Sequence, residues 1–173
     1  MKLLIALFGA MTLAACQSYP FQSSGKQARA NLEAKSGSKV AGQVDFAEQG
    51  NKTRVSVKVS GLKPNSQHGF HVHEKGDCSS ADALTAGGHF NPDGNPHAHA
   101  GAARRHAGDL VNLVADSKGE STASFEVDTI RVDEGKHGIL NRAVIIHANP
   151  DDYVSQPVGN AGGRLACGII KKV

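Results

Sequence analysis

The sequence predicts an all-β protein, an antiparallel sandwich or flattened barrel of about eight strands. Apolar residues alternate with polar ones along several short runs, as in strands that bury one face. Clusters of Gly, Ser, Asn and Pro separate these runs and predict turns. No stretch has a convincing helical period, and short strands without helices pack most economically as two layers or a closed sheet.

The first three predicted strands form a meander. Strands are predicted over 28–34, 40–47 and 55–59, where alternate residues are mostly Ala, Val, Leu or Phe. Turns are predicted at 36–38 and 49–51, which contain Gly, Ser or Asn. The residues expected to face the core in the first strand are Ala28, Ala30, Leu32 and Ala34.

Two long loops interrupt the later strands. A fourth strand is predicted over His68–His73, followed by a segment rich in Gly, Ala, Asp, Asn and Pro, Glu74–Gly108. A second Gly- and Pro-bearing loop is predicted over Asn149–Gly163. Loops this long inside a small domain are usually functional or disordered. The remaining strands are predicted over Leu110–Ala115, Thr122–Val127, Arg142–Ala148 and Leu165–Lys171.

Length and composition indicate one domain with its own core. At 173 residues, with 39% hydrophobic and 20% charged residues, the chain is too short for two domains of ordinary size. The formal net charge of +3 is small, and no basic run with interleaved aromatic residues occurs. Nucleic-acid binding is therefore not expected.

The N-terminus has the layout of an export signal. Lys2 precedes an apolar run, Leu3–Phe8, and the segment ends in Leu13-Ala14-Ala15-Cys16. This ending resembles the bacterial lipoprotein signal, in which the cysteine becomes the lipidated first residue of the mature chain. An ordinary signal peptide with a bystander cysteine is the alternative.

These features divide the chain into three parts. We expect a lipoprotein signal peptide over 1–15, a flexible polar tether over 16–27 and a single domain over 28–173. Lipidation of Cys16 would anchor the protein to a bacterial membrane on the periplasmic side. Gln17, rather than Asp, after that cysteine favours the outer membrane.

Export would bring the chain into an oxidising compartment, where the two remaining cysteines, Cys78 and Cys167, can pair. A disulfide across so long a loop contributes roughly 4 to 5 kcal/mol in the chain-entropy model. Two buried free thiols are the alternative.

A dense group of histidines points to a metal site. Seven of the nine histidines fall between His68 and Asp109, and the segment ends on that carboxylate. Imidazole is the commonest protein metal ligand, and carboxylate is its usual anionic companion. A histidine-rich solvated loop is the alternative, and the spacing of the histidines disfavours it.

Two strands are expected to supply rigid ligands. His71 and His73 flank Val72, so both imidazoles project from one face while Phe70 and Val72 point to the other. With Phe70 and Val72 in the core, the metal would lie outside the barrel, beneath the long loop and within reach of solvent. His147 ends an apolar strand and could add a ligand from across the sheet, or be a lone structural histidine.

The long loop offers a second ligand set. Three imidazoles with one carboxylate make a tetrahedral zinc site. With the three strand histidines, the loop residues give enough ligands for two metals only if one is shared, and a deprotonated imidazole can bridge two cations. The loop residues, separated by 8, 9 and 3 positions, are His89, His97, His106 and Asp109.

Five motifs along the chain carry a family resemblance. They are Gly69-Phe70-His71-Val72-His73-Glu74, Gly76-Asp77-Cys78, Gly88-His89-Phe90-Asn91-Pro92, Arg105-His106-Ala107-Gly108-Asp109-Leu110 and Gly159-Asn160-Ala161-Gly162-Gly163-Arg164-Leu165-Ala166-Cys167-Gly168. Together they resemble copper/zinc superoxide dismutase, most of all its exported bacterial branch, from about Ala28 to the C-terminus. The resemblance implies an eight-stranded antiparallel Greek-key flattened barrel with two long functional loops.

The resemblance also implies a role for each candidate residue. His89 would bridge the two metals, the cysteines would form the family's disulfide, Asp151 would link ligands of both metals from outside, and Arg164 would be the active-site arginine. Copper would be held by His71, His73, His89 and His147. Zinc would be held by His89, His97, His106 and Asp109.

The implied activity is disproportionation of superoxide to dioxygen and hydrogen peroxide by alternate reduction and oxidation of copper. Zinc has no redox chemistry, so only copper can cycle. On reduction, His89 would leave copper and take a proton for the peroxide, while Arg164 would draw in and orient the anion. Superoxide, and the membrane through Cys16, are the expected partners; the sequence leaves open whether the protein is a homodimer.

Some alternatives stay open. An exported protein that buffers copper or zinc would need the ligands but not Arg164. His106 and Asp109 disfavour a copper-only relative, and the full copper set with its export signal disfavours a chaperone-like one. His99 lies two residues after His97 and is the alternative zinc ligand or a solvated neighbour. The residues expected to carry no chemistry are His68 and His137.

Overall fold

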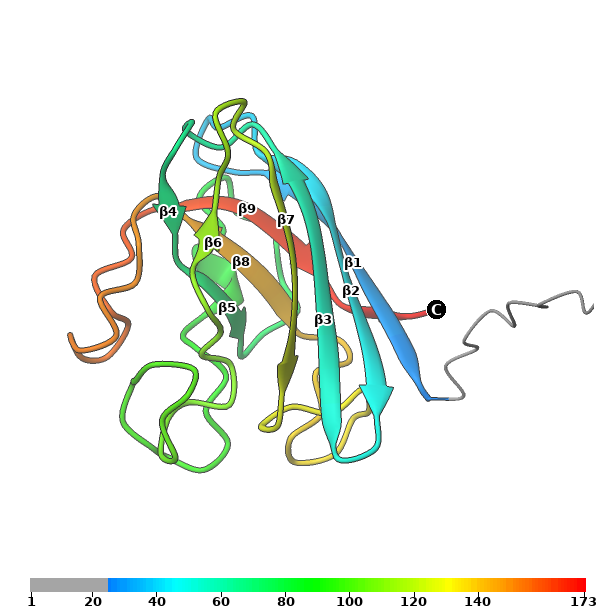
Figure 1. Cartoon of the computed structure of the whole chain (residues 1–173). Helices are drawn as coiled ribbons and strands as arrows, with labels where there is room; N and C mark the ends of the chain where they lie inside the picture. Colours follow the sequence, from blue (N-terminus) through cyan, green and yellow to red (C-terminus); the bar gives the residue numbers. More distant parts are fainter. Residues whose placement is uncertain (1–24) are drawn as a thin grey trace, which may run out of the picture.

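The computed structural model describes residues 25–173 (Figure 1). The signal peptide predicted over 1–15, the lipidation site predicted at Cys16 and most of the predicted tether lie outside the described residues. The elements of the described part are β1 (Gln27–Ala34), β2 (Ala41–Gln49), β3 (Lys52–Ser60), β4 (Gln67–His68), β5 (Phe70–His73), the 3-10 turn η1 (Leu84–Ala86), β6 (Leu113–Val114), β7 (Ser121–Val127), β8 (Ala143–His147), β9 (Arg164–Ile169) and β10 (Lys171–Lys172).

Most strands belong to one curled antiparallel sheet. Its order is β5-β8-β9-β1-β2-β3-β7, with β10 beside β1, and β4 pairs separately with β6. β1 joins the two halves, because it pairs with β2 along most of its length and with β9 at its end. Figure 1 shows β8 and β9 running across the molecule at an angle to β3 and β7. The predicted all-β antiparallel fold is confirmed.

The core follows from the alternation in the sequence. Val44 pairs with Val57 and Phe46 pairs with Val55 across β2 and β3, and all four side chains are buried. β8 is buried throughout because each of its faces meets a different cluster. Val144 and Ile146 join the main core, whereas Ile145 packs in a smaller cluster around the disulfide.

Three details of the strand prediction are wrong. Ala34 is exposed, because β1 leaves β2 there and pairs with β9 through Ala166. The strand predicted over His68–His73 is split at Gly69, and its two parts pair with different strands, β6 and β8. Only two residues of the run predicted over Leu110–Ala115 form a strand, because the start of that run is bound to the other long loop through Asn112.

The first long loop is bound to β5 rather than hanging free. The amide of Val72 donates to the carbonyl of Gly108 over 3.0 Å, and the carbonyl of Val72 accepts from the amide of Phe90 over 2.9 Å. A Cβ at Gly108 would lie 2.2 Å from that Val72 carbonyl oxygen, so only glycine allows this approach. Figure 1 shows both long loops on the side of the molecule where β5 and β8 lie. Within residues 25–173, no helix is long and apolar enough to cross a membrane.

Candidate metal centre

Two groups of metal-ligating side chains lie next to each other and share His89. In each group, one ligand atom per residue can be chosen so that all lie within 4.8 Å of one another, and every member is buried. The four-histidine cluster consists of His71, His73, His89 and His147. The histidine–aspartate cluster consists of His89, His97, His106 and Asp109.

Strand geometry builds the four-histidine cluster. His71 and His73 project from one face of β5, while Phe70 and Val72 enter the main core from the other, as the alternation predicts. His147 ends the neighbouring strand β8 and places its Nε2 atom 3.3 Å from Nε2 of His73. The ring centroids of His71 and His89 lie 3.9 Å apart. Two rigid strands therefore fix three of the four imidazoles.

Asp109 is the centre of the histidine–aspartate cluster. Its Oδ1 atom lies 2.9 Å from Nδ1 of His89, 3.0 Å from Nδ1 of His97 and 3.2 Å from Nδ1 of His106. Its Oδ2 atom accepts hydrogen bonds of 3.1 Å from the amides of Ala98 and His106. The carboxylate is thus held by the backbone of the loop, with three imidazole nitrogens converging on one oxygen.

Asp151 connects the two clusters from outside. Its Oδ2 atom lies 2.7 Å from Nε2 of His71, and its Oδ1 atom lies 2.9 Å from Nε2 of His97. The side chain of Asn112 holds the backbone of Asp151 through hydrogen bonds of 2.9 and 3.0 Å. A Cβ at Gly159 would approach Oδ1 of Asp151 to 1.9 Å, so that position has no room for a side chain.

The orphaned ring nitrogens fit a metal centre. Nδ1 of His71 and Nε2 of His89 are buried and have no hydrogen-bond partner. Buried polar atoms are almost always paired, so these two unpaired atoms need another partner. Imidazole nitrogens are ligands for both copper and zinc, and the donor sets of the two clusters fit these two metals.

Burial and the two carboxylates set opposite protonation states. Burial lowers the pKa of His89 to about 4 and that of His147 to about 3, so both are neutral, the form that binds metals. Burial also opposes a charge on His97, but hydrogen bonds to Asp109 and Asp151 outweigh it and raise the pKa to about 9. The two carboxylates therefore favour a positive charge in the histidine–aspartate cluster.

A pocket of about 310 Å³ leads to the four-histidine cluster. It reaches His73, His89 and His147, and Arg164 stands in its wall. The Arg164 guanidinium donates hydrogen bonds of 2.7 Å to the carbonyl of Ala83 and 2.6 Å to that of Gly87. A fixed cation beside a solvent-reachable histidine cluster suits a small anion.

The predicted disulfide is confirmed: Cys78 is bonded to Cys167, so the alternative of two free thiols is wrong. It attaches the loop that carries η1 to β9, on which Arg164 also lies. Cys167 packs with Ala83, Ala86 and other residues of the smaller cluster. The loop that supplies the two carbonyls to Arg164 is therefore fixed covalently.

The remaining histidines lie outside both clusters. His99, the alternative to His97, is exposed and rests against Tyr153 with ring centroids 4.6 Å apart. His137 is half-buried, and its Nδ1 atom lies 3.0 Å from the carbonyl of Thr129. His68 is buried, with Nδ1 2.8 Å from the carbonyl of His147, so it supports a strand that bears a cluster residue. Sequence reasoning missed this role, although His68 shares the alternation of Phe70 and Val72.

The fold and the site together define a β-barrel protein with a candidate dinuclear metal centre. The family model described as copper/zinc superoxide dismutase matches residues 40–170, and the chain belongs to that family. It is a superoxide dismutase, an oxidoreductase with copper and zinc as cofactors and superoxide as substrate.

Three relatives of this chain are named as copper/zinc superoxide dismutases. The chain is 44% identical over 141 residues to the superoxide dismutase [Cu-Zn] of Paramecium bursaria Chlorella virus 1, covering 76% of this chain and 72% of the relative. It is 45% identical to superoxide dismutase [Cu-Zn] 2 of Brassica juncea, covering 76% and 89%. It is 36% identical to superoxide dismutase [Cu-Zn] 2 of Aquifex aeolicus (strain VF5), covering 76% and 80%.

A solved structure described as that of the clock protein EA4 has the same fold. It superposes with a TM-score of 0.78 at 39% sequence identity, covering 90% of this chain and 99% of that chain.

Proposed function

We propose that the four-histidine cluster holds copper, that the histidine–aspartate cluster holds zinc, and that His89 bridges them. The observation that carries this assignment is the division of the His89 ring between the clusters. Its Nδ1 atom faces Asp109 at 2.9 Å, and its Nε2 atom is buried without a partner. Three imidazoles and a carboxylate suit tetrahedral zinc, which leaves the all-imidazole set for copper.

Copper, when bound, supplies the electron exchange that zinc cannot. The residues of the chain bind the anion and handle one proton. Arg164 binds superoxide in the pocket and holds it beside His73, His89 and His147. Nε2 of His89 takes up a proton in one half of the cycle and gives it to the peroxide product in the other, while water supplies the second proton.

The neighbouring groups keep these residues in place. Arg164 is fixed by two carbonyls, and His71 is fixed by Asp151 over 2.7 Å. Such outer partners set the orientation and the basicity of a metal-binding imidazole. The Arg164 cation and the His71 ring therefore need little rearrangement during turnover.

We further propose that the enzyme is exported, lipidated at Cys16 and anchored in a bacterial outer membrane, where it removes extracytoplasmic superoxide. The support is the sequence of residues 1–17, with its basic start, apolar run and small residues before the cysteine. Expression of the whole chain followed by membrane fractionation and mass analysis of the N-terminal peptide tests this. A lipidated Cys16 in the outer-membrane fraction is expected, and Cys16→Ser should abolish lipidation and remove the protein from that fraction.

Metal analysis of the purified domain, combined with a superoxide-decay assay before and after copper chelation, tests the metal assignment. Near-stoichiometric copper and zinc with copper-dependent decay are expected. His147→Ala should lose copper and activity while keeping zinc, whereas His137→Ala, a histidine outside both clusters, should keep both metals. Full metal occupancy without dismutation would instead identify a metal-buffering protein.

A further inference from the structure

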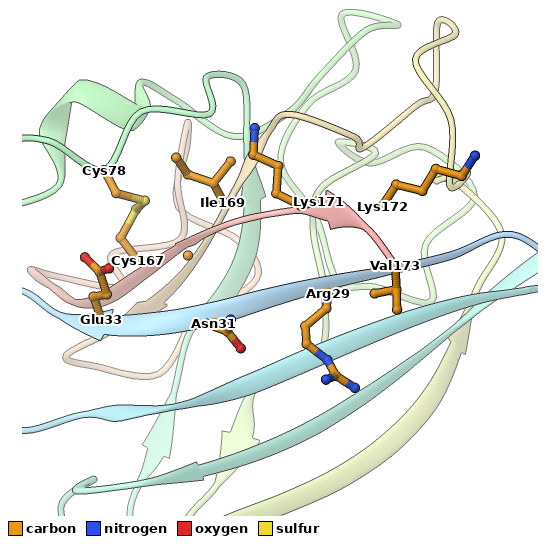
Figure 2. Close-up of a pocket in the computed structure, with 10 residues that line it drawn as sticks. Arg29, Asn31, Glu33, Cys78, Cys167, Ile169, Lys171, Lys172 and Val173 are labelled. Atoms are coloured by element: carbon orange, nitrogen blue, oxygen red, sulfur yellow. A yellow bond between two sulfur atoms is a disulfide. The ribbon is translucent and has the colours of Figure 1, made fainter.

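The turn that follows β1 lies against both β9 and the first long loop. At the end of β1, Glu33 pairs with Cys167 of β9. Figure 2 shows Glu33 beside the disulfide of Cys167 and Cys78, in a groove that runs along β1. Lys35 follows directly and begins a turn of four residues, 35–38, which we call the β1–β2 turn.

The β1–β2 turn is bonded to β9 at the residue after Arg164. The amide of Lys35 donates a hydrogen bond of 2.7 Å to the carbonyl of Leu165. The hydroxyl of Ser38 donates one of 2.6 Å to the same oxygen. The amide of Ser38 closes the turn on the carbonyl of Lys35 over 2.9 Å. The main chain that carries Arg164 is therefore fixed to this turn.

The same turn also holds the first long loop. The Lys35 ammonium donates a hydrogen bond of 2.5 Å to the carbonyl of Cys78. The amide of Ser36 donates one of 2.8 Å to the carbonyl of Ala81. Lys35 is half-buried, and a charged donor makes a stronger hydrogen bond than a neutral one. The β1–β2 turn therefore fixes the loop at two points.

Both ends of Arg164 depend on these contacts. Its backbone is held through Leu165, and its guanidinium binds the carbonyls of Ala83 and Gly87. These carbonyls lie two and six residues beyond Ala81 in the loop. One turn therefore sets the place of the strand that carries the cation and the place of the carbonyls that hold it.

The disulfide alone does not fix the loop in this way. The bonds of a cysteine side chain can rotate, so a disulfide leaves the plane of the neighbouring peptide free to turn. The ammonium of Lys35 binds the carbonyl of Cys78 itself and so fixes that plane. The direction in which the loop leaves Cys78 is therefore set by Lys35.

We propose that Lys35 is a positioning residue for Arg164. Its ammonium fixes the peptide of Cys78, and the loop in turn holds the guanidinium in the pocket that leads to the four-histidine cluster. Ser36 and Arg164 line that pocket, whereas Lys35 is not among its lining residues in the described part of the chain. The proposal rests on the proposed function of Arg164 as the cation that binds the anion.

The charge of Lys35 gives a rival explanation that the test must separate. Attraction between exposed charges extends over about 10 Å at 0.1 M salt and needs no hydrogen bond. Lys39 is an exposed lysine four residues further on and carries the same charge. It is therefore the matched control for loss of a positive charge beside this turn.

The test measures azide binding to the domain loaded with copper and zinc by optical titration, because this anion binds without turnover. Lys35→Met removes the ammonium and keeps a side chain of similar length. It should weaken azide binding about fivefold, a size typical of coupling within one network. Lys39→Met should stay within about twofold of the unmodified protein. Lys35→Arg, which keeps a charged donor, should also stay within about twofold.

A double-mutant cycle with Arg164 separates positioning from charge attraction. Arg164→Ala should weaken azide binding about tenfold. Adding Lys35→Met to that variant should then change little, because no guanidinium is left to position. The proposal is overturned if Lys35→Met acts as strongly without Arg164 as with it, or no more strongly than Lys39→Met. Unchanged azide binding in Arg164→Ala itself would instead show that the proposed function of Arg164 is wrong.

Hydrogen–deuterium exchange gives a second readout that depends on neither azide nor Arg164. Lys35→Met should speed exchange in the loop 79–88, which includes the amide of Gly87, bonded to the carbonyl of Leu84 over 3.0 Å. Exchange in β2 and β3 should stay the same. Unchanged exchange in the loop, or faster exchange throughout the domain, would each contradict the positioning role.

Discussion

His73 and Arg164 share one hydrogen-bond acceptor, the backbone carbonyl of Gly87. The oxygen lies 2.9 Å from Nδ1 of His73 and 2.6 Å from Nη2 of Arg164. A single peptide group therefore sets the distance between a proposed copper ligand and the cation that faces the proposed substrate pocket. Gly87 has a φ of 74°, and a Cβ there would lie 2.3 Å from Oε1 of Glu74.

Gly87→Ala should lower dismutase activity without removing a charged or metal-binding group. The substitution places a side chain in the left-handed region and against Glu74, so the shared carbonyl must move. We expect a loss of about 1 to 3 kcal/mol in unfolding free energy and a several-fold lower rate of superoxide decay. Gly94→Ala is the control, because Gly94 has a φ of 64° with nothing within 4 Å. Equal activity losses in the two variants would contradict the role of the carbonyl.

Arg164→Ala should reduce the rate of superoxide decay while copper and zinc contents stay the same. A fixed positive charge in the pocket raises the encounter rate of an anion by about tenfold or more at low ionic strength. The variant should therefore be slower and less sensitive to salt in a pulse-radiolysis assay. Arg54→Ala, on the exposed face of β3, should behave like the unmodified protein. An unchanged rate and salt dependence in Arg164→Ala would rule out the role.

His97 and His99 should differ sharply in their effect on zinc. Nδ1 of His97 lies 3.0 Å from Oδ1 of Asp109, whereas the His99 ring is exposed. His97→Ala should weaken zinc binding by more than about 100-fold, since even an outer partner of a ligand is worth 10- to 100-fold. His99→Ala should leave zinc affinity within about twofold of the original in a competition titration. The reverse order would transfer the ligand role to His99.

Asp151→Asn should weaken both metal sites together. Only one of its two terminal atoms can still accept a hydrogen bond, so either His71 or His97 loses its partner. We expect zinc and copper affinities to fall by about 10- to 100-fold. Asp152→Asn, at an exposed neighbouring carboxylate, is the matched control and should change neither affinity. Loss of one metal alone would show that Asp151 does not couple the two sites.

The metal-free protein should lose stability between pH 7 and pH 5. Burial holds the folded pKa of His89 at about 4 and that of His147 at about 3, whereas an unfolded histidine titrates near 6.5. Below that pH the unfolded chain binds more protons, which favours unfolding by about 2 kcal/mol per histidine at pH 5.

His97 acts in the opposite direction. Its folded pKa of about 9 gives stability that is fully present below pH 6.5 and lost as the pH rises through 9, and it offsets about 1 kcal/mol of the loss at pH 5. Urea unfolding of the metal-free protein at the two pH values measures the net effect. His147→Gln should shrink the pH difference by about 2 kcal/mol, and an unchanged difference would contradict a neutral buried His147.

The sequence by itself determined the strands and the chemistry of the site. Alternation at every second residue is a local property, so it placed His71 and His73 on one face of β5 and the valines of β2 and β3 in the core. The types and spacing of histidine and aspartate alone indicated two metals. Where a local break intervened, as at Gly69, the strand prediction was wrong, because pairing with two different partners is not encoded locally.

Only the tertiary structure decided which distant groups meet. It brought Asp151 from the second long loop to His71 and His97, joined His73 to Arg164 through Gly87, and placed His68 beneath His147. It also left His99 in solvent. These contacts depend on backbone carbonyls, on glycine positions with no room for a Cβ atom and on loops that bind to strands far away in sequence. The periodic pattern of the sequence does not predict these contacts, because they arise from the packing of the whole chain.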